Sequence, residues 1–561
     1  MDSNDFLINR YLPRTDFESY DDFKKNYSVN VPFDFNFAYD IIDEWAKNFP
    51  DKKALYYTND HGVLKEYTFK DISLLSNKTA NALRAEGIKK GDTVLMMLKQ
   101  RAEVWITIIA LHKLGAVVIP ATFQLTPHDI SYRCESAKCK MIIMVDEEQV
   151  LKHVADALPE CTTVKKLLVH GTNIPDSPIY DDFLELIENA SDELERVPTT
   201  IDDKMLIYFS SGTTGMPKMI LHNYDYPLGH IVTAKYWHHV EDGSRHLTVC
   251  DSGWAKFAWG KIYGQWICGA EIVAYDDDKF VPENLLRVIR EAKLTTFCAP
   301  PTIYRFLIKE DLKKEDFASI HHCTIAGEPL NPEVYNKFYE LTGHYVHEGF
   351  GQTETSVILG NFGWDPIKPG STGKPAPLYD IDLVDDEGNS CEDGVVGSIV
   401  IRNLSKYHPT GLFQEYYEAP ETNARSFTND WYNTGDTAWR DSDGYFWFEG
   451  RNDDVIKCSG YRIGPFEVES ALMTHPSVLE CAVTAAPDPV RGQVVKATIV
   501  LTKNYQASEE LKTELQTHVK NATAPYKYPR IIEFVKELPK TTSGKIKRCD
   551  IRQSDSDSTK S

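Results

Sequence analysis

The stretch Tyr208-Phe-Ser-Ser-Gly-Thr-Thr-Gly-Met-Pro-Lys218 indicates the fold of this chain more specifically than any other part of the sequence. The apolar residues 205–209 are typical of a strand, which leads into a loop of serine, threonine and glycine. Such a loop offers backbone N–H groups and hydroxyls to phosphate oxygens, and its glycines allow close approach. The loop is not a Walker A motif, because Pro217 precedes Lys218 and Met219 follows it. A Ser/Gly-rich turn alone would more often be an ordinary linker, but the full string is far more specific. It indicates a phosphate loop of another kind, with Lys218 as a positive charge for the β- and γ-phosphates.

Upstream of this loop, short apolar runs alternate with a helical pattern. The helical pattern covers residues 102–115, and the apolar runs cover 92–98, 116–121 and 140–145. Strands that alternate with helices indicate an α/β fold with largely parallel sheets. A chain of 561 residues also exceeds the roughly 250–300 residues at which a single core stops growing, so several domains are expected.

The charge and the apolar pattern argue against several classes of protein. A formal net charge of -22 disfavours a protein that coats nucleic acid or binds anionic membranes. The N-terminus is acidic and polar, unlike a signal peptide. The longest apolar stretch, Trp105–Phe123, is interrupted by His112 and Lys113 and is too polar to span a membrane. The 11 cysteines include no CxxC pair, so we expect reduced thiols and a cytosolic protein.

A domain boundary is expected near residue 452, within a short acidic segment. From 451 to 552 the chain carries sixteen Lys and Arg against twelve Asp and Glu, although the whole chain is strongly acidic. A basic domain against an acidic one suits a polyphosphate bound at their junction, and chance asymmetry is the alternative. We expect an N-terminal domain at 1–452, a mobile C-terminal domain at 453–552 and a disordered tail at 553–561.

In full, the string SSGTTGMPK resembles the phosphate loop of the adenylate-forming (ANL) superfamily of acyl-CoA synthetases, peptide-synthetase adenylation domains and beetle luciferases. The resemblance covers roughly residues 40 to 552. Further matches follow in the family's order: GEPL (327–330), GFGQTET (349–355), YNTGD (432–436), GRNDDVIKCSGYRIGPFEVE (450–469) and PKTTSGKIKR (539–548). SGYRIGPFEVE, DPVRGQVVKA (488–497) and TAPYKYPR (523–530) are most similar to the medium-chain acyl-CoA synthetase branch.

The resemblance implies an α/β fold with three parts. They are a large N-terminal domain of layered α/β subdomains, a small β-barrel-like subdomain near 370–450, and a small mobile α/β C-terminal domain. The predicted strand and helix runs agree with such a fold. The resemblance also implies that the small domain turns about Asp453 between two half-reactions.

The resemblance further implies an ATP site in the N-terminal domain. Phe350 would stack on adenine, although a core phenylalanine is the alternative. Glu354 would hold Mg²⁺ through the ATP phosphates, Asp436 would accept both ribose hydroxyls, and Arg451 would be a second ribose contact. The implied ATP and AMP contacts of this domain are Ser210, Ser211, Gly212, Thr213, Thr214, Gly215, Lys218, Gly327, Glu328, Pro329, Glu348, Gly349, Phe350, Gly351, Gln352, Thr353, Asp436 and Arg451.

The C-terminal domain is implied to contribute a catalytic lysine and the CoA site. Lys545 would bridge the acid's carboxylate and the α-phosphate, although a lone lysine is usually a solvated surface residue. Lys545, Glu354 and Thr213 form the implied catalytic set, and Arg462 would contact the α-phosphate. The implied CoA contacts are Ser459, Gly460, Tyr461, Arg491, Lys520 and Tyr528.

The acyl pocket departs from that of acetyl-specific relatives, which carry a blocking tryptophan at the position of Gly351. Loss of an indole opens space for several methylenes, each worth about 0.8 kcal/mol when buried. Trp254 resembles the residue that walls the pocket in the medium-chain branch. Trp259 and Trp237 could refill the space in favour of short or branched acids, or could be ordinary core residues.

These residues imply an ATP-dependent acid:CoA ligase. It would convert a short- to medium-chain carboxylic acid into acyl-AMP, releasing pyrophosphate, and then into acyl-CoA, releasing AMP. The implied cofactor is Mg²⁺ with ATP, and CoA is a co-substrate; no nucleic acid and no membrane span are expected, and monomer and homodimer are both open. One alternative is an adenylating enzyme that loads another acceptor, which the CoA-branch motifs disfavour. The other is a dead homologue that senses nucleotides, which the complete ATP-site motifs disfavour.

Overall fold

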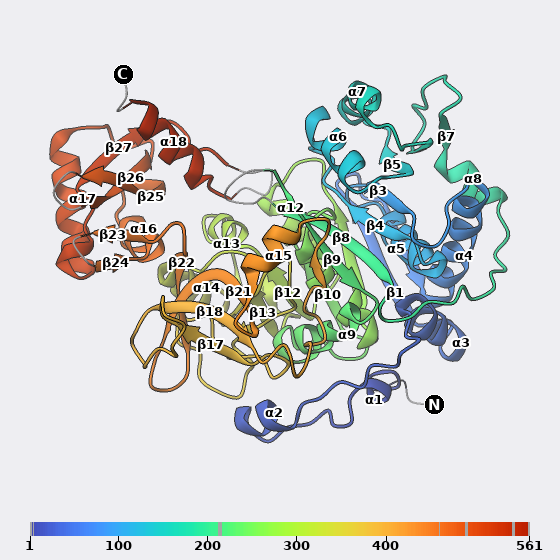
Figure 1. Cartoon of the computed structure of the whole chain (residues 1–561), viewed down its shortest axis with the longest axis horizontal. Coiled ribbons are helices and arrows are strands. Elements are labelled where there is room, and N and C mark those ends of the chain that lie inside the picture. The colour runs from blue at the N-terminus through green and yellow to red at the C-terminus, as the bar shows by residue number, and fades with distance from the viewer. Residues whose placement is uncertain are drawn as a thin grey trace.

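The computed structural model of the chain describes residue 3 and residues 5–210, 216–458, 461–488, 492–540 and 545–558. Side chains are described in the same ranges except at 457, 461, 462, 492 and 556–558. Within these ranges the strands form four sheets (Figure 1). The N-terminal helices lie along one side of the body: α1 (Ile8–Tyr11), α2 (Tyr20–Asn26), η1 (Ala38–Asp43) and α3 (Glu44–Asn48).

An eight-stranded sheet carries the phosphate-loop hairpin, in the order β19-β9-β8-β4-β3-β5-β6-β7. Its strands are β3 (Thr93–Met97), β4 (Val117–Pro120), β5 (Met141–Val145), β6 (Lys166–His170), β7 (Tyr180–Asp182), β8 (Lys204–Ser210), β9 (Lys218–Asn223) and β19 (Glu415–Tyr416). β3 pairs in parallel with both β4 and β5, and every residue of β3 is buried, as expected for strands covered on both faces. The three predicted apolar strands are confirmed.

Helices accompany this sheet, and α5 (Glu103–Leu114) is the helix predicted at 102–115. The others are α4 (Phe69–Ala85), α6 (Pro127–Ser136), α7 (Glu148–Ala157), η2 (Leu158–Glu160) and α8 (Phe183–Asn189). α4 begins with a capping box in which Thr68 and Asp71 satisfy each other's backbone N–H groups. α5 ends at Gly115, whose φ of 69° is the left-handed conformation that glycine adopts without strain.

A nine-stranded sheet carries the predicted adenine-binding motifs, in the order β16-β15-β14-β13-β12-β10-β11-β1-β2. Its strands are β1 (Lys53–Asn59), β2 (Leu64–Thr68), β10 (Arg245–Thr248), β11 (Glu271–Asp276), β12 (Thr296–Ala299), β13 (His322–Ile325), β14 (Val346–Phe350), β15 (Leu359–Gly360) and β16 (Lys374–Pro375). β12, β13 and β14 are parallel neighbours, so their carboxyl ends share one edge, where ligands bind in open α/β sheets.

The helices of this second layer connect its strands, and their buried residues belong to two separate hydrophobic clusters. The helices are α9 (Tyr226–Ile231), η3 (Val232–Trp237), α10 (Ala255–Gly260), α11 (Tyr263–Ile267), α12 (Pro282–Glu291), α13 (Pro301–Leu307), η4 (Lys314–Phe317) and α14 (Pro332–Thr342). Buried side chains from both layers, among them Trp105, Trp237 and Trp266, join one continuous hydrophobic core.

A five-stranded antiparallel sheet occupies the region predicted to be β-barrel-like. Its strands are β17 (Ile381–Val384), β18 (Gly397–Arg402), β20 (Phe427–Thr428), β21 (Trp431–Arg440) and β22 (Phe446–Arg451), and α15 (Pro420–Ser426) lies before β20. β21 pairs with β22 so that Asp436 stands opposite Arg451. The two predicted ribose residues are therefore cross-strand neighbours.

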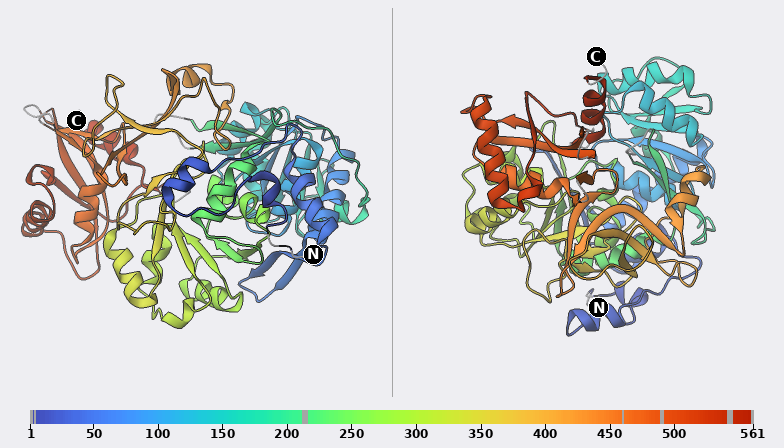
Figure 2. Two further views of the ribbon diagram at one scale, coloured as in Figure 1. Left: turned by 90° about the horizontal axis from the view of Figure 1, so that it is seen from below. Right: turned by 60° about the vertical axis from the view of Figure 1, so that its left-hand side comes forward.

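The C-terminal part has its own sheet and its own core. Its elements are β23 (Ile456–Cys458), β24 (Tyr461–Ile463), α16 (Pro465–Met473), β25 (Val478–Asp488), β26 (Gly492–Leu501), α17 (Glu509–Ala522), η5 (Pro525–Lys527), β27 (Ile531–Val535) and α18 (Arg548–Ser558). A separate buried cluster runs from Ile456 to Ile532. Figures 1 and 2 show this part as a distinct body at one end of the molecule. The predicted α/β fold class is confirmed, and the predicted boundary falls between β22 and β23.

The end of the chain differs from the prediction of a disordered tail at 553–561. α18 continues to Ser558, because it packs against the C-terminal sheet and the Asp555 carboxylate pairs with the Lys496 ammonium. Such long-range pairing cannot be seen in a local polar composition. Among the helices of the described residues, none is both long and apolar enough to cross a membrane.

Candidate active site

The phosphate-loop hairpin places Lys218 at the predicted site. β8 and β9 are antiparallel, with Ser210 opposite Lys218 at the end of the hairpin. The Lys218 ammonium lies 4.6 Å from the centre of the Tyr416 ring, a cation–π distance. The predicted loop residues Ser211, Gly212, Thr213, Thr214 and Gly215 lie outside the described residues.

Glu354, the predicted metal carboxylate, is buried beside this hairpin. Its side chain is 8% exposed, and Oε1 accepts a 2.8 Å hydrogen bond from the Tyr416 hydroxyl. Burial raises the pKa of Glu354, while the Tyr416 hydrogen bond and the charges of Arg451 and Lys218 oppose that rise. The sequence motifs at 218 and 354, far apart along the chain, are thus brought together.

A chain of hydrogen bonds runs from Glu354 to the ribose residues. The Tyr416 and Tyr432 hydroxyls are 3.2 Å apart, and the Tyr432 hydroxyl donates to Gln352 Oε1 at 2.9 Å. The Gln352 amide donates to Asp436, whose carboxylate lies 3.4 Å from the Arg451 guanidinium. Burial raises the pKa of Asp436 to about 6, with Arg451 as the largest opposing influence.

The predicted adenine residues follow two neighbouring parallel strands. Gly327, Glu328 and Pro329 begin two residues after the end of β13, and Phe350 ends β14. Phe350 is half-buried, and its ring centroid lies 5.6 Å from that of Phe448. Thr353 adjoins this turn, and its carbonyl oxygen lies 2.9 Å from the His222 ring.

Glu348 is the most strongly perturbed of the predicted adenine residues. Its Oε2 accepts from the Leu330 N–H at 3.2 Å, and its Oε1 has no hydrogen-bond partner in the described part of the chain. Burial raises the pKa of Glu348 to about 8. A neutral carboxylic acid can both donate and accept a hydrogen bond, which suits recognition of a base edge.

Lys545 is solvent-exposed and lies within electrostatic range of this site. Its positive charge is one of the influences that lower the pKa of Asp436 and of Lys256. Lys256 lies on α10, and its ammonium donates to the Ala326 carbonyl at 2.8 Å, beside the predicted adenine wall. Burial is the main cause that lowers the pKa of Lys256.

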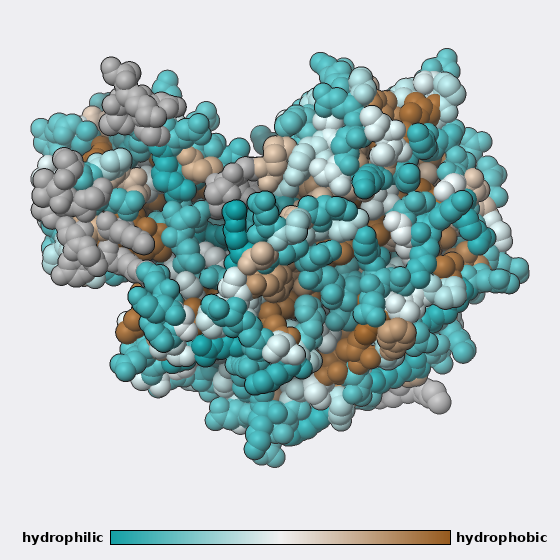
Figure 3. Space-filling model, viewed as in Figure 1, coloured by the Kyte–Doolittle hydropathy of each residue, from teal (hydrophilic) through white to brown (hydrophobic). Residues whose placement is uncertain are grey.

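Ion pairs tie the helix that follows Lys545 to the hinge region. On α18, Arg548 makes two 2.8 Å contacts with the Glu469 carboxylate, and both Arg548 and Arg552 pair with Asp454. The predicted hinge residue Asp453 is exposed in the turn after β22, and its carboxylate lies 3.9 Å from Arg451. The surface is indented between the C-terminal domain and the rest of the molecule (Figure 3).

The predicted acyl pocket contains two indoles packed against glycines. A Cβ at Gly351 would overlap the Trp259 ring and lie 2.6 Å from the Ser356 carbonyl oxygen, and one at Gly349 would overlap Trp237. The two indoles are 6.0 Å apart and nearly perpendicular, and the Trp259 N–H donates to Thr355. Trp259 therefore occupies the space that the missing side chain of Gly351 leaves.

Trp254, the other predicted pocket residue, immediately precedes α10 and is half-buried. Its loop packs tightly on the chain after β4, because a Cβ at Gly253 would overlap the Thr122 nitrogen.

The predicted CoA residues are only partly described. Lys520 on α17 places its ammonium 4.0 Å from the centre of the Tyr528 ring, and Arg530 covers the same ring at 4.8 Å. β24 carries Tyr461 and Arg462, whose side chains are outside the described set. Ser459, Gly460 and Arg491 also lie outside the described residues.

Sequence reasoning missed Tyr416, Tyr432 and Lys256. Lys256 follows the recognised Trp254 by two positions, and a buried lysine beside an aromatic run is a weak signal that could have found it. Tyr432 opens the recognised YNTGD motif, which is the signal that could have found it. Tyr416 carries no such signal, because only tertiary contacts bring it to Glu354.

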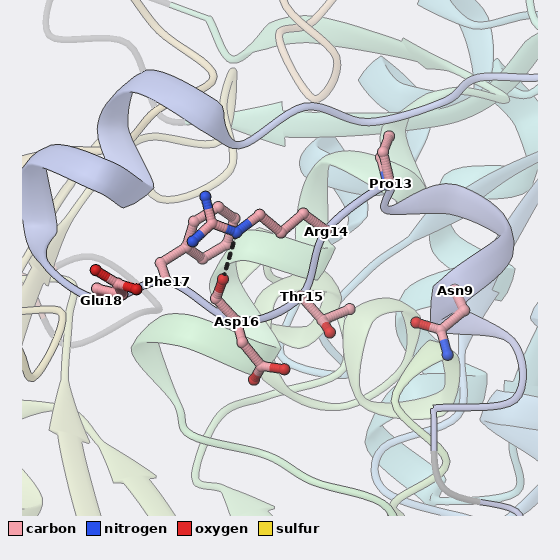
Figure 4. A pocket seen from close by; sticks show the side chains of 7 residues that line it. All are labelled: Asn9, Pro13, Arg14, Thr15, Asp16, Phe17 and Glu18. Atoms are coloured by element: carbon pink, nitrogen blue, oxygen red, sulfur yellow. Dashed lines mark hydrogen bonds between the residues drawn. The ribbon is translucent and has the colours of Figure 1, made fainter.

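The surface also has a hollow that none of the predicted site residues lines. Figure 4 shows it along the N-terminal segment, lined by Asn9, Pro13, Arg14, Thr15, Asp16, Phe17 and Glu18. The Arg14 guanidinium lies over the Phe17 ring and donates to the Asp16 carbonyl at 2.7 Å. Local contacts account for these side chains, and no predicted site residue lines the hollow.

Known proteins are similar to this chain in both sequence and fold. The profile of the AMP-binding enzyme family matches residues 42–417, and that of the AMP-binding enzyme C-terminal domain matches residues 467–545. The acyl-coenzyme A synthetase ACSM3, mitochondrial, of Pongo abelii is 41% identical over 555 residues, which cover 97% of this chain and 94% of that protein.

Two solved structures show the same architecture. The crystal structure of the anthranilate CoA ligase AuaEII in complex with anthranoyl-AMP matches with a TM-score of 0.85 at 30% identity, covering 95% of this chain and 99% of the other. The benzoate CoA ligase of Burkholderia xenovorans LB400 matches with a TM-score of 0.80 at 27% identity, covering 92% of this chain and 100% of the other. The chain therefore belongs to the AMP-binding enzyme family, the adenylate-forming superfamily, as one of its acyl-coenzyme A synthetases.

Proposed function

We propose that this enzyme activates a short- to medium-chain carboxylic acid with ATP and transfers the acyl group to CoA. The observation that supports this most is the meeting of Lys218, Glu354, Asp436 and Arg451 around one site, with Lys545 within electrostatic range. Lys218 would match the phosphates, Asp436 the ribose hydroxyls and Lys545 the carboxylate of the acid. The products would be acyl-CoA, AMP and pyrophosphate.

Mg²⁺ is proposed as the cofactor of the ATP. The residues fit a divalent cation, because a buried carboxylate at Glu354 supplies a hard oxygen ligand and a nearby positive charge would favour its ionised form. When bound, the ion would neutralise charge on the ATP phosphates. Ser210, Lys218 and Glu354 are the described residues that would hold the phosphate end of the nucleotide.

In the first half-reaction, the acid's carboxylate attacks the α-phosphate and pyrophosphate leaves. The carboxylate is already a nucleophile, so this step needs charge stabilisation and not a base. Lys545 would bridge the carboxylate and the α-phosphate, with Arg462 as a further contact. Asp436 and Arg451 would orient the ribose, and Phe350 with residues 327–329 and Glu348 would hold the adenine.

In the second half-reaction, the CoA thiolate attacks the acyl-adenylate and AMP leaves. We propose that the C-terminal domain, residues 453–552, turns about Asp453 between the two steps. This turn would withdraw Lys545 and bring Ser459, Gly460 and Tyr461 to the acyl group, with Arg491, Lys520 and Tyr528 on the CoA nucleotide. One closed site for both steps would keep the reactive adenylate from water.

Changing Gly460 to leucine tests the proposed turn. The added side chain is expected to narrow the path of the CoA thiol and to slow thioester formation by about tenfold or more, which corresponds to a steric cost of about 1.4 kcal/mol or more. Pyrophosphate release in the first turnover should stay near that of the wild type, so acyl-AMP accumulates. Rapid-quench measurement of acyl-AMP and acyl-CoA separates the steps. Unhindered CoA turnover would contradict the assignment of Gly460.

A panel of acids tests the proposed reaction. With ATP and CoA present, straight-chain acids of about four to eight carbons are expected to give the fastest pyrophosphate release, since each buried methylene adds about 0.8 kcal/mol until the pocket is full. Branched and aromatic acids belong in the same panel. CoA thiol should disappear in step with pyrophosphate formed. Pyrophosphate release without thiol loss would indicate another acceptor, and no release with any acid would indicate a nucleotide sensor.

The compartment is a separate proposal. The scattered free cysteines are compatible with the reducing cytosol, which we propose as the location. The related ACSM3 protein of Pongo abelii carries "mitochondrial" in its name. Fractionation of native cells with an antibody to the protein tests the proposal.

A further inference from the structure

We propose that Tyr416 is a positioning residue that aligns the phosphate lysine, Lys218, with the metal carboxylate, Glu354. The proposal rests on the proposed function, because it takes these two residues as the phosphate-end ligands of Mg·ATP. One side chain serves both: the Tyr416 hydroxyl donates to Glu354 Oε1 at 2.8 Å, and its ring faces the Lys218 ammonium at 4.6 Å.

The backbone around Tyr416 is attached to both partners. β19 pairs antiparallel with β9, the strand that begins at Lys218, and Tyr416 stands opposite Ile220. Just before β19, the Phe413 N–H donates to the carbonyl of Glu354 at 2.7 Å. Residues 413–417 therefore form a strap that is hydrogen-bonded to the phosphate hairpin and to the turn that carries Glu354.

The side-chain amide of Asn423 holds the backbone of the strap in place. Asn423 on α15 accepts a hydrogen bond from the Tyr416 N–H at 2.7 Å and donates to the Tyr416 carbonyl at 2.8 Å. Tyr416 itself is 3% exposed and packs edge-on against Phe413, with ring centroids 4.8 Å apart. The hydroxyl therefore has little freedom, and a hydrogen bond to a carboxylate from a fixed donor is among the stronger ones in proteins.

The same hydroxyl connects the phosphate end to the ribose end. From Tyr416 the contacts continue through Tyr432 and Gln352 to Asp436, as described above. Tyr432 should therefore matter mainly for the ribose end, because its hydroxyl holds Gln352. Tyr416 should matter mainly for the phosphate end, because its own bond is to Glu354.

Tyr416→Phe separates these roles, since it removes the hydroxyl and keeps the ring under Lys218. Binding is measured by isothermal titration calorimetry without acid or CoA, using ATP with excess MgCl₂, ATP with EDTA, and AMP alone. We expect the variant to bind Mg·ATP about tenfold more weakly, and to bind AMP and metal-free ATP within about twofold of the wild type. Tyr432→Phe should instead weaken AMP and Mg·ATP alike.

A double-mutant cycle shows whether Tyr416 acts through Glu354. In a Glu354→Gln background, Tyr416→Phe should change Mg·ATP binding by less than about twofold, because the partner carboxylate is already absent. Tyr445→Phe is the matched control: it removes a similarly buried hydroxyl that donates to the Pro366 carbonyl at 2.6 Å, away from the site. That control should leave all three ligands unaffected.

Asn423→Ala loosens the strap without touching the tyrosine, and serves if Tyr416→Phe fails to fold. It should reproduce the selective loss of Mg·ATP binding at smaller size. Equal weakening of all three ligands by Tyr416→Phe or Asn423→Ala, or no weakening at all, would overturn the proposal. Failure of the wild type to release pyrophosphate with any acid would instead overturn the proposed function and leave the binding comparison interpretable.

Discussion

Replacing Lys545 with alanine is expected to slow acyl-adenylate formation by about 10²–10³-fold, the range typical of losing one preorganised charge at a transition state. The effect should fall on the rate constant more than on ATP binding, because Lys545 is proposed to stabilise charge that develops during attack. Its positive charge already lowers the pKa of Asp436 and Lys256, so it lies within electrostatic range of the nucleotide site.

The same variant should form the thioester at nearly the wild-type rate from acyl-AMP that is supplied. Single-turnover pyrophosphate release measures the first step, and CoA consumption with synthetic acyl-AMP measures the second. Lys547→Ala is the matched control, since Lys547 is exposed two residues further on and pairs with Asp550 at 3.8 Å. Equal loss in both half-reactions would contradict the proposed domain turn.

Lys545 is positioned to move with the small domain as a unit. It precedes α18, and α18 is tied by Arg548 and Arg552 to Asp454, which is adjacent to the proposed hinge residue. Arg548 is also bonded to Glu469 on α16, inside the small domain. These ion pairs are partly buried, which makes them costly to break singly. A turn about Asp453 would therefore carry Lys545 out of the site without melting α18.

Local sequence patterns were sufficient to predict the parallel strands β3, β4 and β5. β3 and β5 are buried along their whole length, so they appear in the sequence as continuous apolar runs. The helix α5 between β3 and β4 is buried from Val104 to Leu114 and ends at a glycine. β19 could not be predicted in this way. It has two residues, and its partner β9 lies about two hundred positions earlier in the chain.

The site residues that lie within recognisable sequence motifs could be predicted. Asp436 and Arg451 were named from two separate strings, and the antiparallel pairing of β21 and β22 places them opposite each other. Tyr416 was missed because its role depends on a strap that touches two distant motifs. The helix at 553–558 was missed for the same reason, since the partner of Asp555 is Lys496.

Trp259→Ala is expected to extend the range of acids that the enzyme accepts. The Trp259 indole fills the space beside Gly351, so its removal would leave room for several methylenes. Each methylene accommodated should raise kcat/KM by up to about fourfold, which corresponds to 0.8 kcal/mol. Longer straight-chain acids should therefore gain by one to two orders of magnitude relative to butyrate. The measurement is kcat/KM across acids of increasing length, with the melting temperature followed because a buried indole is lost.

Gly351→Trp probes the same space from the opposite side. In the wild type, a second indole has no room there, because even a Cβ would overlap Trp259 and crowd the Ser356 carbonyl. The single substitution should therefore lower activity with every acid through overpacking. Combined with Trp259→Ala, which removes the ring overlap but not the crowding by the Ser356 carbonyl, it should recover activity only in part and selectively with the shortest acids. An unchanged chain-length profile in Trp259→Ala would mean that the acyl chain does not reach residue 351, and Trp254 would then be the remaining wall to test.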